Sequence, residues 1–323
     1  MDFGIHIGTR GCLTTRENIM AMASNAEAGG YAIIGVADHL IVPVHTDVRY
    51  PYTADGIWPG APTGECFDAI ATLTFLAGFT QRIKLLTSVL VVPYRPAVLT
   101  AKLWLNAGLV SDVIVVTSDL SCNPENVRNF RDLGVARVDT GGLETCRPFS
   151  PASRGFNMGE ASVAFVLSSQ PAGGYARLLG GAMTNDAYHV VSIAPDHDQV
   201  KRCVGDALAD AGVSAAEIAY LNAHATGTKQ CDAAETDLLD TVLTQAHAVA
   251  TKPFTGHCQG AAAAVELAGV CFAYEHQEIA SPPAAPDAHP RLLDGKTSMK
   301  DGLTLKTALG MGGHNTAVVM SAP

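Results

Sequence analysis

The sequence predicts an α/β fold, because short apolar runs alternate with helix-like segments along most of its 323 residues. Tyr31–Ala37 and Ile83–Val92 are almost continuously apolar, which is the pattern of parallel strands buried on both faces. Hydrophobic residues make up 48% of the chain and charged residues 16%, which allows a sizeable core. The length permits one large domain or two ordinary ones.

Composition narrows the function classes. The formal charge of −10 disfavours nucleic acid as the main partner. Eight cysteines are scattered without a C-x-x-C pair, which indicates reduced thiols and not a disulfide framework or a zinc site. No secretory signal pattern follows Met1, and the longest apolar run, Ala261–Tyr274, is too short to span a bilayer. We therefore expect a cytoplasmic protein with no bound metal and no membrane span.

The first hundred residues predict three βα units with parallel strands. Thr14 is the expected N-cap of the first helix, which should end at Gly29-Gly30. The polar, proline-containing stretch Asp38–Gly64 is expected to be a loop. The expected strands are Asp2–Gly8, Tyr31–Ala37 and Ile83–Val92, and the later helices are Phe67–Phe79 and Pro96–Trp104.

The remaining chain is expected to mix strands and helices. Asn123–Thr140 is polar and is predicted to be a loop, as is the Pro/Ala-rich stretch Ser281–Pro290. The expected strands are Val113–Ser118, Val163–Leu167, 175–182, 188–193, Ala219–Ala223, Leu303–Leu309 and Ala317–Ser321. The expected helices are Asp198–Ala211, Glu235–Ala246 and Gln259–Glu275.

Two histidines lie at tight turns, where an imidazole can face a cavity and donate to a developing negative charge. His224 begins the run His-Ala-Thr-Gly-Thr, and His257 ends the run Lys-Pro-Phe-Thr-Gly-His that starts at Lys252. Glu235 lies between them. This combination resembles the C-terminal half of the β-ketoacyl synthases, which have the thiolase-like fold and the motifs H-G-T-G-T and K-x-x-x-G-H. Ala225 stands where the first of these motifs has glycine.

Other segments resemble the same family in the expected order, over residues 105–323. The run Ser153–Ala161 resembles the family's R-x-G-F-x-x-G-E-G-A segment, and Gly310–Asn315 resembles its G-F-G-G-T-N loop. The resemblance implies a layered α-β-α region in which His224 and His257 hold a malonyl thioester oxygen through Nε2. It also implies that Lys252 pairs with Glu235. The loop of Gly310, Met311, Gly312 and Gly313 would gate the site, with the Met311 N–H as an oxyanion donor.

The activity implied by this resemblance is decarboxylating Claisen condensation of acyl and malonyl thioesters, in fatty-acid or polyketide synthesis. The implied partners are acyl carrier protein or acyl-CoA thioesters, a homodimer is possible, and no cofactor is needed. The family's nucleophile lies in a T-A-C-S-S elbow upstream of the strand at Val113, and this sequence has no such segment. Cys66, Cys122 and Cys258 are better explained as structural thiols. We therefore expect an impaired acyltransferase, with a non-catalytic acyl-binding or carrier-binding remnant as one alternative.

The N-terminal region has a different resemblance. Gly35–His39, Tyr50–Gly60 and Leu86–Val89 resemble the luciferase-like monooxygenases, which are TIM-type β/α barrels that bind FMN or a deazaflavin. The resemblance implies cofactor-pocket positions at His39, Thr87 and Ser88. It covers residues 1–104, an incomplete TIM-barrel-like segment of three βα units where a closed barrel has eight. A flavin- or deazaflavin-dependent oxidoreductase is therefore the second alternative.

The sequence thus predicts a chimera with domains at residues 1–104 and 105–323. A gene fusion, a deletion product and an engineered chain all remain open. A metal site formed by His224, Asp232 and Glu235 does not match a recognised ligand spacing.

Overall fold

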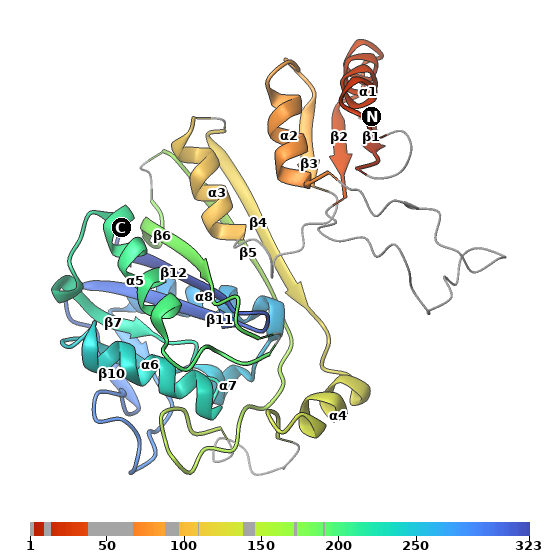
Figure 1. Cartoon of the computed structure of the whole chain (residues 1–323). Coiled ribbons are helices and arrows are strands. Elements are labelled where there is room, and N and C mark those ends of the chain that lie inside the picture. Colours follow the sequence, from red (N-terminus) through yellow and green to blue (C-terminus); the bar gives the residue numbers. More distant parts are fainter. Residues whose placement is uncertain are drawn as a thin grey trace. The chain divides into compact units, whose positions relative to one another are not determined.

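The computed structural model describes residues 3–9, 14–37, 67–87, 97–108, 110–137, 146–170, 173–189 and 191–323. The chain divides into two compact units, the first covering residues 1–91 and the second residues 92–323 (Figure 1). None of the helices within the described ranges is long and apolar enough to cross a membrane.

The first unit contains a parallel sheet in the strand order β1-β2-β3, which confirms the predicted direction of the strands. Ile7, Ile34 and Leu76 are fully buried in its core. The N-cap of the first helix is Thr15, whose side chain accepts from the N–H of Asn18, so the prediction of Thr14 was wrong by one residue. The elements are β1 (Gly4–Ile7), α1 (Arg16–Ala28), β2 (Ile33–Val36), α2 (Ala69–Ala77) and β3 (Lys84–Thr87).

The second unit is built on a five-stranded sheet in the order β6-β12-β11-β7-β8. Strands β11, β7 and β8 run parallel, whereas β12 is antiparallel to both β11 and β6. The strands are β6 (Arg177–Asn185), β7 (Ile218–Asn222), β8 (His247–Val249), β11 (Leu303–Gly310) and β12 (His314–Ser321).

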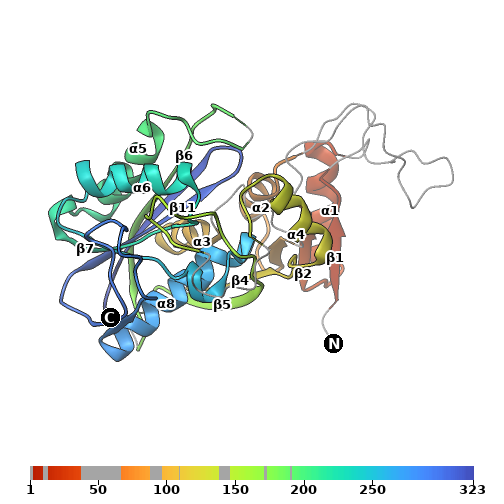
Figure 2. The same ribbon diagram turned by 90° about the horizontal axis from the view of Figure 1, so that it is seen from below.

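Helices cover both faces of this sheet (Figures 1 and 2). Along β12, Ala317 and Val319 join the core beneath α5 and α6, whereas Val318 and Met320 pack with residues of α8. This alternation is what a strand buried on both faces requires, since successive side chains point to opposite sides. The result is the expected α-β-α layering. The helices are α5 (Asp198–Ala211), α6 (Lys229–Thr241) and α8 (Ala262–His276).

A separate antiparallel pair, β4 (Asp112–Asp119) and β5 (Ala161–Ser168), also belongs to the second unit. Helix α3 (Ala97–Asn106) packs against β4, β5 and β6, and its buried Lys102 lies 3.1 Å from Asp210 Oδ2 in α5. The other elements are α4 (Pro124–Asp132), the 3-10 turn Ala215–Glu217, α7 (Lys252–Thr255), the 3-10 turn Gln259–Ala261, β9 (Glu278–Ala280) and β10 (Lys296–Ser298).

Three secondary-structure predictions were wrong. The supposed loop after Asn123 contains α4, because the Asn123 side chain accepts from the N–H of Asn126 and Pro124 starts the helix. The described residues of 188–193 form no strand, since Nδ1 of His189 accepts from two backbone N–H groups that follow it and bends the chain. Helix α6 starts at Lys229 and not at Glu235, and it ends at Thr241.

Candidate functional site

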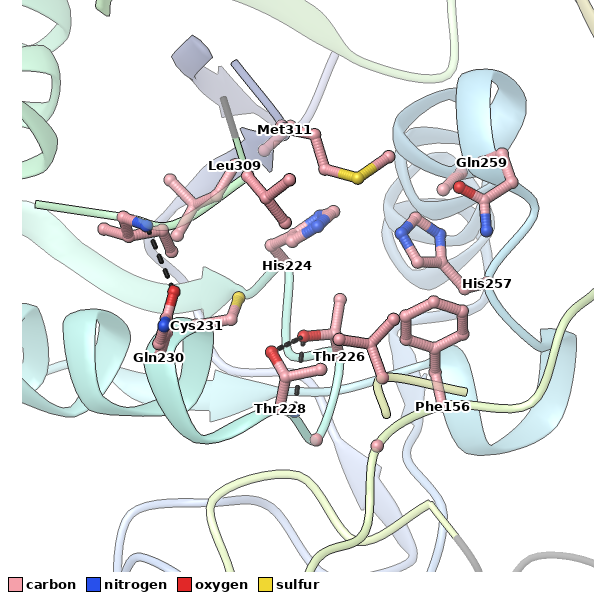
Figure 3. Close-up of a pocket in the computed structure, with 18 of the residues that line it drawn as sticks. Phe156, His224, Thr226, Thr228, Gln230, Cys231, His257, Gln259, Leu309 and Met311 are labelled. Atoms are coloured by element: carbon pink, nitrogen blue, oxygen red, sulfur yellow. Dashed lines mark hydrogen bonds between the residues drawn. The ribbon is translucent and has the colours of Figure 1, made fainter. Parts of the chain in front are cut away.

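A cavity of about 1130 Å³ lies in the second unit and brings both predicted histidines together (Figure 3). His224 follows β7, His257 follows α7, and Met311 follows β11. Phe156 and Leu309 add apolar lining. We call this space the histidine cavity. Its wall is therefore assembled from the ends of several elements, as is usual for ligand sites in α/β folds.

Glu235 fixes the turn that carries His224. Its two carboxylate oxygens accept the N–H groups of His224 and Ala225, each at 2.7 Å, and Oε1 also accepts from the Thr307 hydroxyl at 2.6 Å. Ala225 has a φ of +44°, a conformation that favours glycine, so the backbone is strained at this residue. The glutamate compensates by satisfying two buried backbone donors.

Lys252 forms its ion pair with Glu266, so the predicted pairing with Glu235 was wrong. Lys252 Nζ lies 2.5 Å from Glu266 Oε1 in α8, and both side chains are about 1% exposed. The same ammonium donates to the backbone carbonyl of His224 and lies 3.3 Å from its Nδ1. Glu235 does not take this role because backbone N–H groups and Thr307 already occupy its oxygens.

Sequence reasoning missed two members of this cluster, Glu266 and Lys306. Lys306 is buried in β11, and its Nζ lies 2.7 Å from Glu266 Oε2. Burial lowers the pKa of Lys306 from its ordinary value. The sequence did mark both residues as unusual. Glu266 is a lone charge in the apolar run Ala261–Tyr274, and Lys306 interrupts a buried strand.

His257 is held in place by the segment Ser153–Ala161, which resembles R-x-G-F-x-x-G-E-G-A. Its N–H donates to the Asn157 carbonyl at 2.7 Å, and its carbonyl accepts from Gly159 at 3.1 Å. The Phe156 ring meets the imidazole edge-on, with centroids 4.7 Å apart. Gly256, just before it, has a φ of +67°, and a Cβ there would lie 2.8 Å from the Met158 carbonyl. This motif therefore positions a histidine.

The two imidazoles form a close pair of neutral rings. Their centroids are 5.3 Å apart and their planes meet at 83°. Burial, and then the positive charge of Lys252, lower the pKa of both histidines well below the ordinary value. An ammonium can only donate, so Nδ1 of His224 accepts from Lys252 and the ring proton sits on Nε2.

The predicted glycine loop also reaches the cavity. It joins β11 to β12, and Gly310 and Met311 line the cavity wall. Gly312 and Gly313 have φ values of +86° and +76°, which a tight hairpin turn of this kind requires. Their carbonyls accept from the Asn185 side chain at 3.0 Å and from the Asp186 N–H at 2.9 Å.

Cys231 is the cysteine that lines the histidine cavity within the described residues. It is buried, and burial followed by the charge of Glu235 raises its pKa well above the ordinary value. Burial also raises the pKa of Cys258, and it raises that of Cys146 to about 12. These groups are therefore thiols at neutral pH, whereas thiol nucleophiles need a thiolate.

The predicted cofactor contacts come from the N-terminal part of the chain. Thr87 ends β3 in the first unit and is half-buried. His39, Ser88 and Cys66 lie outside the described residues. Asp232 accepts from the N–H groups of Phe149 and Gly227, and no three metal-binding side chains are grouped for a metal in the described ranges.

Family comparisons match the two parts of the chain separately. Residues 175–284 match the family model described as the C-terminal domain of β-ketoacyl synthases. Residues 1–111 match the model described as luciferase-like monooxygenase. Both resemblances predicted from the motifs are confirmed.

Curated relatives match about half of the chain. Over 193 residues the chain is 31% identical to 3-oxoacyl-acyl-carrier-protein synthase I, chloroplastic, of Hordeum vulgare, a match that covers 55% of this chain and 42% of that protein. It is 32% identical over 193 residues to 3-oxoacyl-acyl-carrier-protein synthase 2 of Staphylococcus aureus, covering 55% of this chain and 48% of that protein. The chain thus spans less than half the length of these relatives.

Solved ketosynthases share the fold. A type II polyketide acyl-carrier protein in complex with its ketosynthase, bound to a hexaketide, aligns with a TM-score of 0.65 at 26% identity, over 71% of this chain and 60% of that one. A β-ketoacyl synthase from Burkholderia phymatum aligns with a TM-score of 0.66 at 20% identity, over 99% of this chain and 75% of that one. The fold is therefore α/β and thiolase-like.

Proposed function

We propose that the second unit binds a malonyl thioester in the histidine cavity and decarboxylates it through His224 and His257. The observation that carries this proposal is the pair of neutral imidazoles, with centroids 5.3 Å apart, in one cavity. Two neutral N–H donors suit an oxygen on which negative charge develops, because they stabilise that charge by hydrogen bonding and do not transfer a proton to the oxygen.

The reaction breaks the bond between the carboxylate and the α-carbon. Carbon dioxide leaves, and the bonding electrons move onto the thioester as an enolate. Nε2–H of His224 and of His257 would donate to the enolate oxygen while the charge forms. A proton from solvent then adds to the α-carbon and gives the acetyl thioester.

The buried lysines support this role electrostatically. Lys252 and Lys306 share the carboxylate of Glu266, and Glu235 accepts the N–H groups of the His224 turn, so the buried cluster holds two lysines and two glutamates. Burial, and then the charges of Lys252 and Lys306, lower the pKa of both imidazoles and keep the rings neutral. The Lys252 ammonium beside His224 also favours an anionic intermediate.

We further propose that condensation is impaired. Condensation needs a cysteine that carries the acyl chain as a thioester. The thiol in the cavity, Cys231, has a raised pKa and lies 3.8 Å from a Glu235 oxygen, so its environment opposes thiolate formation. A binding remnant without chemistry is the alternative, in which the same cavity holds an acyl group and leaves it unchanged.

The thioester would arrive on acyl carrier protein or coenzyme A. Support comes from the similar ketosynthase that was solved in complex with its acyl-carrier protein. We propose a homodimer on the same basis of family resemblance. Both carriers present the thioester at the end of a long flexible arm, so both must be tested.

The experiment incubates the full-length chain with malonyl-CoA, and separately with a malonyl carrier protein, and follows acetyl thioester by mass spectrometry. We expect formation of acetyl thioester, and a loss of about 10²–10³ in rate in His224→Ala and in His257→Ala. Malonyl thioester that stays intact contradicts the proposal, and so do undiminished rates in both variants.

A second candidate function belongs to the first unit and is favoured by the match of residues 1–111 to luciferase-like monooxygenases. We propose that residues 1–104 form an incomplete TIM-barrel-like segment. The described strands there number three, where a barrel uses eight to build its cofactor pocket. Three βα units supply only part of such a pocket wall, so we expect no tight binding of FMN or a deazaflavin. Thr87, at the end of β3, is the predicted contact that lies among the described residues. Visible absorbance of the purified protein would reveal a bound flavin and favour this candidate.

A further inference from the structure

A third histidine of the cavity wall lies at the end of the glycine loop. His314 begins β12 directly after Gly313, and it lines the histidine cavity, as Met311 does (Figure 3). Its ring is half-buried, and Nδ1 lies 3.3 Å from Nδ2 of Asn185, the residue that ends the neighbouring strand β6. The loop motif G-F-G-G-T-N has threonine at this position, so the imidazole is a departure of this chain from that pattern.

The orientation of the Asn185 amide is fixed by two backbone groups. Its Oδ1 accepts from the N–H of Ala187 at 2.7 Å, and its Nδ2 donates to the carbonyl of Gly312 at 3.0 Å. A backbone N–H can only donate and a carbonyl can only accept, so the oxygen and the nitrogen of this amide cannot be exchanged. The nitrogen that faces His314 is therefore a donor, and Nδ1 of the imidazole accepts from it.

This contact makes the imidazole sensitive to protonation. A neutral ring that accepts at Nδ1 carries its proton on Nε2. A second proton, taken from solvent, would go to Nδ1, and two donors would then face each other across the 3.3 Å between His314 and Asn185. The hydrogen bond therefore exists only while the imidazole is neutral. Imidazoles change charge between about pH 5 and 8.

The other groups around His314 do not replace this contact. On the β6 side the adjoining charged residue is Asp186, whose oxygens accept from the Asn315 amide at 2.6 Å and from the Ala194 N–H at 3.0 Å. On the β11 side, His314 pairs with Gly310, which carries no charge. The titratable and charged residues elsewhere on the cavity wall are His224, His257, Cys231, Asp119, Arg137, Arg154 and Lys229.

We propose that Asn185 and His314 form a pH-sensitive latch on the glycine loop, in which neutral His314 holds the Asn185 amide against Gly312 and protonated His314 releases it. The loop that carries Met311 is then held at neutral pH and loosens in acid. That the latch regulates entry of a thioester rests on the proposed function, whereas the latch itself does not.

The first test is ¹⁵N NMR of the full-length protein labelled in histidine, because the two ring nitrogens report which one carries the proton. His314→Asn assigns the His314 signals by their loss. At pH 7.5 we expect the proton on Nε2 and an unprotonated Nδ1. A neutral ring with its proton on Nδ1 overturns the latch.

The second test is amide hydrogen exchange at Asp186, whose N–H donates to the loop carbonyl of Gly313 at 2.9 Å. Rates at pH 7.5 and pH 5.5 are corrected for intrinsic exchange. Protection of this amide should be about 2–10-fold lower at pH 5.5, the change in an equilibrium that one hydrogen bond typically causes. The Ala223 amide, bonded to the Val249 carbonyl in the same sheet, measures any general loss of stability.

Three variants isolate the imidazole. In His314→Asn the amide oxygen takes the place of Nδ1 and does not titrate, so protection of Asp186 should not show the extra loss at pH 5.5. His276→Asn makes the same change at an imidazole that is 70% exposed, and it should keep the wild-type response. In Asn185→Asp a carboxylate accepts from a protonated Nδ1, so protection should rise in acid.

The rate arm distinguishes the latch from the proposed function. If the wild type decarboxylates malonyl-CoA, its KM at pH 5.5 should exceed that of His314→Asn about 2–10-fold, because a released loop must be reordered on binding. Equal KM values would remove the link between latch and site. If the wild type shows no decarboxylation, the proposed function fails and the exchange data still decide the latch. Equal losses of Asp186 protection in the wild type and His314→Asn, or no loss in the wild type, overturn it.

Discussion

Lys252 and Glu266 form an ion pair with Nζ and Oε1 2.5 Å apart, and each side chain is about 1% exposed. Lys306 lies 2.7 Å from the other oxygen of the same carboxylate. Two buried lysines therefore share one glutamate. This arrangement sits directly behind His224, because Lys252 also contacts its Nδ1.

Replacing Glu266 should destabilise the second unit strongly. Glu266→Gln leaves two buried lysines without a carboxylate, and removing one partner of a buried pair typically costs about 3–5 kcal/mol. Urea unfolding measures the loss. The matched control is Glu278→Gln, since Lys296 and Glu278 form an exposed pair at 2.6 Å whose worth is about 0–1 kcal/mol. Equal losses in the two variants contradict the buried network.

The neutral histidines give a predicted pH dependence. Their folded-state pKa values lie below the ordinary value of 6.5, so below that pH the unfolded chain binds more protons than the folded chain. Wild-type stability should therefore fall, relative to a His224→Gln, His257→Gln double variant, as pH decreases below about 6.5. Unfolding free energies of both proteins at pH 7.5 and at pH 5.5 measure it. A constant difference between the two proteins would speak against buried neutral rings.

The cysteines should resist acylation. Burial raises the pKa of Cys231, Cys258 and Cys146, which keeps these groups as thiols. Intact mass after incubation with an acyl carrier thioester should show no stoichiometric acyl group. One acyl group per chain that disappears in a single Cys→Ala variant would identify a nucleophile and refute this expectation.

Limited proteolysis tests the division of the chain. The predicted boundary at residue 104 falls inside α3, yet Lys102 of that helix is ion-paired with Asp210 of α5. We expect a stable C-terminal fragment that retains α3, with its N-terminus before Ala97. Sequencing the fragment decides this. A stable fragment that begins after Asn106, or a stable piece of residues 1–104 alone, contradicts the division into units.

Much of the site could be predicted from the sequence because its residues sit in short motifs. His224, His257 and Met311 come from separate motifs, and the structure places all three around one cavity. The partner of Lys252 could not be predicted in the same way. Glu235 and Glu266 are both buried acids on helices, and the choice between them depends on which backbone N–H groups each meets.

The errors in secondary structure have local causes. The start of α4 was signalled by Asn123-Pro124-Glu125, a helix cap followed by proline, but the polar composition of the stretch obscured it. The start of α6 was missed because Lys229–Ala234 lacks apolar residues at helical spacing. In the structure Asp232 holds the beginning of the helix, since its carboxylate accepts from the N–H of Gly227.

The most direct test of the central claim is a product analysis. The full-length chain is given an acyl carrier thioester together with a malonyl carrier thioester, and all thioesters are identified by mass spectrometry. We predict acetyl thioester from decarboxylation at the pair His224 and His257, with no β-ketoacyl thioester. A β-ketoacyl product would contradict the loss of condensation, and recovery of both thioesters unchanged would contradict the decarboxylation itself.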